Sequence, residues 1–153
     1  TVMWTTAIAV MIWVSAADAA KNARRARRVE TYDMRRVIQP AIAASWRSPL
    51  DEALAYVDPD TGRPPLVVVL DDSGLPHGLL DRRSAQSAAP GTEVNEHIRR
   101  LGPWIGAPAD ITAPHLLESL THRPRATHCL VLDGETLVGL IDLPEFFDEL
   151  LAH

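Results

Sequence analysis

The residues of this chain that could carry catalytic chemistry are its six histidines, its single cysteine and its serines. Zinc-dependent hydrolysis needs two histidines one helical turn apart with a glutamate between them, as in H-E-x-x-H. Glu96 and His97 supply the adjacent letters, but no second histidine lies four residues before or after His97. His122 and His128 flank a helix breaker and a strand start, so they do not share a helix face. We therefore expect no metal site and no metal cofactor within this sequence.

Nucleophilic catalysis has no better support. The sequence contains no G-x-S-x-G turn and neither of the glycine-rich phosphate-binding motifs. His128 and Cys129 are adjacent, but neighbouring residues on a strand point to opposite faces, so imidazole and thiol would not meet. Cys129 lies in an apolar run, which favours a buried small side chain. We expect this segment to have no catalytic residues.

The strands and turns that would position any site occur twice in the sequence. Residues 66–82 read LVVVLDDSGLPHGLLDR, and residues 130–142 read LVLDGETLVGLID. Asp71 recurs as Asp133 and Gly78 recurs as Gly139. A continuous apolar, β-branched run followed by a glycine-containing turn and a second short run predicts two neighbouring strands. Internal repetition at a period of roughly 60 residues predicts two similar halves.

Helices are expected around these strands. Ser48 as N-cap with Pro49 at the first helical position predicts a helix over LDEALAYV, and Thr112 with Pro114 predicts one over APHLLESLTH. RRSAQSAA and LPEFFDELLAH are predicted to be the closing helices of the two halves. Each half is thus a β-α-β-β-α unit of α/β class. Neither half buries enough surface to be stable alone, so we expect them to pack sheet against sheet.

The first residues of the chain differ in character from the rest. TVMWTTAIAVMIWVSAA carries no charge over residues 1–17, and the basic run KNARRARR follows shortly after it. Seventeen helical residues span about 25 Å, close to the thickness of a bilayer core. A basic flank marks the cytoplasmic side, and a signal peptide would carry its positive charge before the apolar run. We predict a truncated transmembrane helix over residues 1–20; the alternative is an amphipathic soluble helix packed on the later domain.

The charge is also uneven along the chain. Residues 1–40 carry seven Lys/Arg and three Asp/Glu, a net charge of +4. The whole chain has a net charge of −5, so residues 41–153 have a net charge of −9. A basic run without interleaved aromatics, followed by an acidic domain, does not favour nucleic acid as a partner. It favours contact with anionic lipid headgroups.

From residue 41 onward the sequence resembles the cystathionine-beta-synthase (CBS) domain, which normally occurs as a tandem pair. The resemblance is carried by VVVLDDSGLPHGLLDRRS and CLVLDGETLVGLIDLPEF. In that family a hydroxyl and then an acid, three residues apart, begin a helix in the cleft between halves and contact adenine nucleotides. The resemblance places Asp81 and Ser84 at these positions in the first repeat, and Asp142 and Glu145 in the second.

The letters at these positions depart from the family pattern. An aspartate where phosphate would approach repels it, although Glu145 could still accept hydrogen bonds from ribose hydroxyls and Arg82 or Arg83 could offset the charge of Asp81. The alternative is that Asp81 and Asp142 only cap the helices that follow them. Trp104, at the predicted start of the second repeat, could stack on an adenine ring or serve as a core residue.

The whole arrangement resembles the C-terminal part of a site-2 protease family intramembrane zinc metallopeptidase. That resemblance implies residues 1–20 as a transmembrane helix, 21–40 as a basic juxtamembrane helix, 41–90 and 104–153 as CBS repeats, and 91–103 as a linker. It implies a zinc site and protease activity in sequence upstream of Thr1, with residues from about 21 onward cytoplasmic.

The expected function is therefore regulatory. The pair would sense a ligand, such as an adenine nucleotide, for a membrane protein, and would form a homodimer. The alternative is a ligand-independent dimerisation module of a membrane protein such as a transporter or channel.

Overall fold

The computed structural model describes residues 19–20 and 23–152 of the chain. The predicted transmembrane run over residues 1–17 lies outside these residues, and within them no helix is long and apolar enough to cross a membrane. The basic segment is helical over residues 23–31. The 3-10 helix η1 (Met34–Arg36) then leads to β1 (Gln39–Ser45). The helix predicted up to residue 40 ends early because Asp33 caps η1 and Met34 and Val37 turn into the core.

Two halves with the same order of elements follow, as the repeat predicted. The first consists of β1, α2 (Leu50–Ala55), β2 (Leu66–Leu70), β3 (Pro76–Leu80) and α3 (Arg82–Ala85). The second consists of β5 (Trp104–Pro108), α4 (Ala113–His122), β6 (His128–Asp133), β7 (Thr136–Asp142) and α5 (Leu143–Leu151). The 3-10 helix η2 (Val94–His97) and β4 (Ile98–Arg100) connect them.

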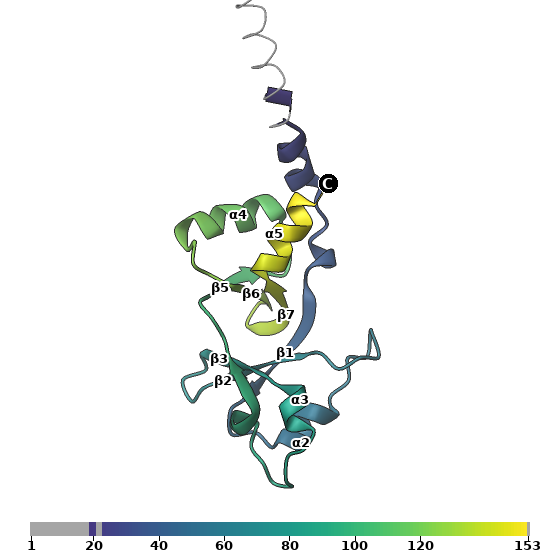
Figure 1. Ribbon diagram of the computed structural model, residues 1–153, viewed down its shortest axis with the longest axis vertical. Helices are drawn as coiled ribbons and strands as arrows, with labels where there is room; N and C mark the ends of the chain where they lie inside the picture. Colours follow the sequence, from purple (N-terminus) through teal and green to yellow (C-terminus); the bar gives the residue numbers. More distant parts are fainter. Residues whose placement is uncertain (1–18, 21–22, 153) are drawn as a thin grey trace, which may run out of the picture.

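The strands form one seven-stranded sheet in the order β4-β3-β2-β1-β7-β6-β5. Figure 1 shows α4 and α5 on one outer side and α2 and α3 on the other, with the strands between them. The sheet curls so that both halves contribute to one apolar cluster, made of Ala41, Val68, Leu130 and Leu140. The halves therefore pack against each other as predicted, but within one continuous sheet, because the start of β1 pairs with β7.

The repeated glycines mark the points where the halves cross. Gln39 and Pro40 of β1 pair with β7 of the second half, and β4 pairs in the same way with β3 of the first half. A Cβ on Gly78 would lie 2.6 Å from the carbonyl oxygen of Arg99, and a Cβ on Gly139 would lie 2.6 Å from Cγ2 of Ile38. Each half thus sends a short strand across the other, and only glycine leaves room for it.

Each half also has its own core between its helices and its part of the sheet. The first is built from small and medium side chains: Leu50, Ala53, Val67, Val69, Leu80, Ala85 and Val94. The second contains larger ones, including Leu116, Ile141, Leu143 and Phe146, all fully buried. The helices differ accordingly, since α2 and α3 have 6 and 4 residues where α4 and α5 have 10 and 9.

Two helix predictions for the first half need correction. The first helix begins at Leu50, one residue later than predicted, and Ser48 does not cap it. The reason is a neighbouring segment: Pro49 bridges to Glu93, and the Ser48 carbonyl accepts the N–H of Val94. The closing helix, predicted over residues 82–89, ends at Ala85, so only the first half of RRSAQSAA is helical.

Candidate functional site

The four predicted ligand residues lie at the starts of the two closing helices. Asp81 caps α3 by accepting the N–H of Ser84 at 3.3 Å, and Asp142 caps α5 by accepting the N–H of Glu145 at 3.2 Å. The capping role predicted for both aspartates is thus confirmed. Both carboxylates are half-buried, whereas Ser84 and Glu145 are exposed. The structure brings each pair together but leaves the two pairs in separate corners.

A cleft of about 320 Å³ opens between the two halves. It is lined by Gln39, Leu66, Leu79, Arg99, Arg100, His128, Leu140 and Asp142. Most of these residues are equivalent in the two repeats. Gln39 pairs with Leu140 as Arg99 pairs with Leu79, so the cleft lies where the two crossing strands meet. Any molecule bound here would touch both halves at once.

In the second-repeat corner, Asp142 lines this cleft and Glu145 does not. Asp142 pairs with His128 across β6 and β7, and His128 pairs with Trp104 across β5 and β6. Gln39 donates from Nε2 to Oε2 of Glu145 at 3.4 Å, which ties the first half's crossing strand to the predicted ribose acid. Trp104 is half-buried and packs on the cluster between the halves, so it has a core role.

The positive charge of the cleft comes from residues that sequence reasoning missed. Arg99 and Arg100 lie on β4 and both line the cleft. The first half carries Gln39 and Pro40 at the equivalent places on β1. The signal in the sequence is the pair of arginines in HIRR, directly before the second repeat and within the predicted linker over residues 91–103. These guanidinium groups, and not Arg82 or Arg83, are the cleft's source of attraction for an anion.

The first-repeat corner is occupied by the chain itself. The Oγ of Ser84 lies 2.6 Å from Nδ1 of His97, and the N–H of Asp81 donates to the carbonyl of His97 at 2.8 Å. Arg82 donates to the carbonyl of Pro65 at 2.7 Å, and burial lowers the pKa of its guanidinium. The Arg82 guanidinium thus hydrogen-bonds to the backbone and not to Asp81. Neither Asp81 nor Ser84 lines the cleft between the halves.

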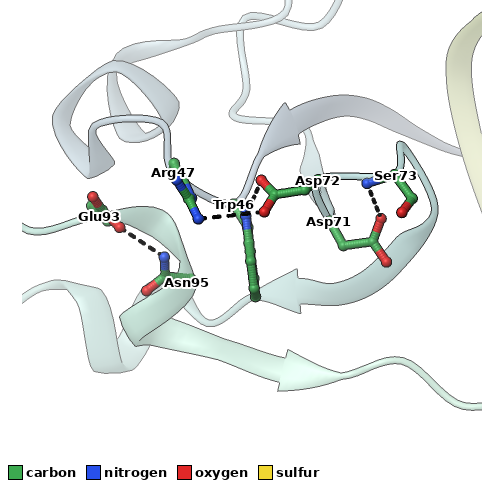
Figure 2. A network of polar contacts seen from close by, with 7 residues as sticks. All are labelled: Trp46, Arg47, Asp71, Asp72, Ser73, Glu93 and Asn95. Atoms are coloured by element: carbon green, nitrogen blue, oxygen red, sulfur yellow. Dashed lines mark hydrogen bonds and ion pairs between the residues drawn. The ribbon is translucent and has the colours of Figure 1, made fainter.

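A polar network stabilises the far end of the first half (Figure 2). Trp46 donates from Nε1 to Asp72 at 2.8 Å, and Arg47 lies 3.4 Å from the same carboxylate. Asp71 accepts the N–H of Ser73 at 2.9 Å within the turn between β2 and β3. The second half has Ala109 where the first has Trp46, since the N–H of Trp46 bonds to the carbonyl of Leu70 and that of Ala109 to the carbonyl of Leu132. The network is thus particular to the first repeat.

Metal and thiol chemistry concern the histidines, the carboxylates and Cys129. Among the residues that the structure describes, no group of three or more His, Cys, Asp or Glu is arranged to hold a metal ion. Cys129 is fully buried, as predicted, and burial raises the pKa of its thiol to about 12. A thiol in that state is a poor nucleophile.

No protein-family model matches the chain, and no curated protein matches it. Several solved structures that are similar to it contain CBS domains. The CBS domain of a bacterial CNNM/CorC family Mg²⁺ transporter, in complex with an inhibitor, aligns over 94% of this chain and 96% of its own, with a TM-score of 0.45 and 17% identity. The CBS domain of that transporter family in complex with ATP gives a TM-score of 0.43 at 18% identity, over 86% and 95% of the two chains.

A third similar structure has a different setting. The CBS domains of a transcriptional regulator from Streptococcus pneumoniae align over 77% of this chain and 98% of their own, with a TM-score of 0.45 and 14% identity. Likenesses at these scores establish neither a ligand nor an attached domain for this chain.

Proposed function

We propose that the two repeats form a regulatory CBS pair that senses an anionic, adenosine-containing ligand in the cleft between the halves. The observation that carries the proposal is the cleft itself, which is lined by both crossing strands and bordered by Asp142 at the start of α5. A ligand in this position bears on the packing of one half against the other. That is the requirement for a sensor whose output is a change in packing.

Different side chains are suited to bind different parts of the ligand. Glu145 is exposed beside Gln39 and is suited to accept hydrogen bonds from ribose hydroxyls. Arg99 and Arg100 are suited to bind phosphate oxygens. Asp142 opposes a phosphate placed directly at the start of α5, so the phosphates are expected to point toward β4. The second-repeat corner is the working site, because the first-repeat corner is occupied by His97.

The signal would leave through β1. Gln39 contacts the cleft, and only η1 separates the start of β1 from the basic helix over residues 23–31. Tyr32 and Arg36, at this junction, contact Glu149 of α5 at 3.2 and 3.8 Å. A ligand that prefers one arrangement of β1 against β7 would shift the orientation of this helix. The helix in turn would connect to a membrane domain through the uncharged residues 1–17.

Isothermal titration of the full chain in detergent micelles with adenosine, AMP, ADP, ATP and S-adenosylmethionine tests the sensor. We expect saturable binding that Glu145→Ala weakens at least about tenfold, because a hydrogen bond to a charged group contributes roughly 1.5–3 kcal/mol. Asp142→Thr keeps a helix cap and removes the repelling charge, so phosphate-bearing ligands should bind at least about fivefold tighter. Glu118→Ala, an exposed acid on α4, is the matched control.

The titration also separates the two corners. Ser84→Ala is expected to leave the affinity unchanged, and loss of binding in this variant would move the site to the first repeat. If no compound binds to the folded chain, the sensor proposal is wrong.

The second candidate function is a ligand-independent dimerisation module. It is favoured by one observation: both aspartates are engaged as helix caps, and neither corner retains the family's hydroxyl. Analytical ultracentrifugation without ligand distinguishes the two, since dimers that no adenine compound alters would support this candidate.

The parent protein is a further part of the proposal. We propose a site-2 protease family zinc metallopeptidase on the resemblance of the whole arrangement alone. The coding sequence upstream of Thr1 tests it, because an H-E-x-x-H motif inside an apolar helix must be found there.

A further inference from the structure

A second hollow lies away from the cleft, where the basic helix meets the second repeat. This groove measures about 560 Å³ and is lined by Arg24, Arg25, Arg28, Val29, Leu117, Phe147, Leu150 and Leu151. Val29 and Leu117 pack on the second repeat's core, so the groove has a fixed floor. Leu150 in the lining is also buried, whereas Leu151 is 72% and Phe147 38% exposed. We call this surface the basic groove.

The basic groove combines two properties that occur together at membrane interfaces. Its floor is apolar and its rim carries three arginines. Among the described residues no Asp or Glu lines it, although residues 41–153 have a net charge of −9. The nearby Glu149 faces Tyr32 and Arg36 instead. Apolar side chains that enter the acyl boundary while arginines contact phosphates are the pattern of an interfacial membrane-binding surface.

The position of the groove also points to a membrane. Its arginines lie on the helix over residues 23–31, a few residues after the uncharged residues 1–17. Figure 1 shows this helix projecting from the second repeat beside the end of α5, at the opposite end of the molecule from α2 and α3. The groove therefore belongs to the end of the molecule from which the proposed membrane segment departs. Rim arginines there are placed to meet headgroups rather than the acidic remainder of the chain.

We propose that the basic groove is a docking surface for anionic phospholipid headgroups, with Phe147 and Leu151 entering the interface between them. The proposal rests on the membrane attachment proposed above and is independent of the ligand in the cleft. Docking would hold α5 against the bilayer. Because Asp142, which lines the cleft, caps the start of α5, docking would couple the lipid composition of the membrane to the geometry of the cleft.

A fluorescent probe on Leu151 tests this docking in the full chain. Leu151→Cys labelled with an environment-sensitive dye is specific, since the native Cys129 is fully buried. The chain is reconstituted into vesicles of phosphatidylcholine alone or mixed with phosphatidylglycerol, and flotation measures attachment separately. We expect a blue shift only with phosphatidylglycerol, and its loss at about 1 M salt, where charges are screened beyond roughly 3 Å.

Matched variants identify the arginines as the cause. Arg24→Gln, Arg25→Gln and Arg28→Gln together should lower the docked-to-undocked ratio roughly a hundredfold, because each basic residue near an anionic surface strengthens binding about fivefold. The same change at the exposed Arg63, Arg123 and Arg125 is the control and should leave the shift intact. A dye on Val57→Cys, 51% exposed and just after α2, should report water in all vesicles.

The outcomes separate this proposal from membrane attachment. Flotation with no shift, or with equal shifts in neutral and anionic vesicles, overturns the docking surface and leaves attachment intact. A chain that does not float overturns both. A shift without vesicles that grows with protein concentration shows that a second copy covers the groove, which also overturns the proposal.

Discussion

The two repeats follow one plan but fill it differently. The closing helix of the second repeat places Phe146 in its core, fully buried, where the first repeat has Ala85. The first repeat compensates with contacts from outside the unit, since residues 92–95 bond to Trp46, Ser48 and Leu50. The difference indicates that the second repeat is the more stable scaffold and that the first depends on the segment that follows it.

The site shows the same division. The second repeat keeps its corner open to the cleft and brings Arg99 and Arg100 on its crossing strand. In the first repeat, His97 hydrogen-bonds to Ser84 and closes the corner. Within the described part of the chain, Gln39 is the only hydrogen-bonding side chain that the first repeat contributes to the cleft lining, and it bonds to Glu145. Under the proposed function, the second repeat carries the ligand site, while the first repeat fills its corner with its own chain.

Phe146→Ala tests the stability comparison and has the largest expected effect. It gives the second repeat the small side chain that the first one carries, and it also removes the edge-on contact with Tyr32, whose ring centre lies 5.8 Å away. We expect a loss of about 3–5 kcal/mol in the free energy of unfolding, because the buried ring leaves a cavity. Urea denaturation followed by circular dichroism measures it. The neighbouring Phe147→Ala, partly exposed, is the control, and equal losses in both variants would contradict the comparison.

The order of strands and helices could be predicted from the sequence because it depends on local patterns of residues. The apolar runs ending at Asp71 and Asp133 indicated the strands, and Asp142 before Leu143 and Pro144 indicated the start of α5. What the sequence could not predict depends on distant contacts. The start of α2 is set by Glu93, and the continuous sheet is set by two residues of β1 that pair with β7.

Gly78→Ala and Gly139→Ala test whether the two crossings are equivalent. At Gly78 the added Cβ meets a backbone oxygen, which moves only if β4 moves, whereas at Gly139 its nearest atom belongs to the Ile38 side chain. We expect Gly78→Ala to lower the free energy of unfolding by about 1–3 kcal/mol, and Gly139→Ala by less. Thermal and urea unfolding of both variants measure the difference. A greater loss at Gly139 would show that the crossing into the second repeat is the tighter one.

The candidate site was predictable in its caps but not in its charges. Asp81, Ser84, Asp142 and Glu145 follow their strands directly, so a sequence pattern locates them. Arg99 and Arg100 belong to no motif and reach the cleft only because β4 crosses onto β3. The closure of the first corner by His97 was equally invisible, because it depends on the path of η2.

Cys129→Val makes the buried strand of the second repeat match the first, which has Val67 at that position, and its expected effect is the smallest. The swap of one buried apolar side chain for another of similar size should change the free energy of unfolding by less than about 1.5 kcal/mol at pH 7.

At alkaline pH the stabilities of the native chain and the Cys129→Val variant should differ. Burial raises the pKa of the Cys129 thiol from 9.0 to about 12, so between these values the unfolded chain loses a proton that the folded chain retains. The native chain should therefore lose stability as the pH rises from 9 toward 12, and the variant should lose less. Tyr32 also has a raised pKa, but it contributes equally to both proteins, so the difference between their urea midpoints at pH 8 and pH 10 isolates the thiol. Identical pH dependence in the two proteins would show that the thiol is not held in its neutral form by the core of the second repeat.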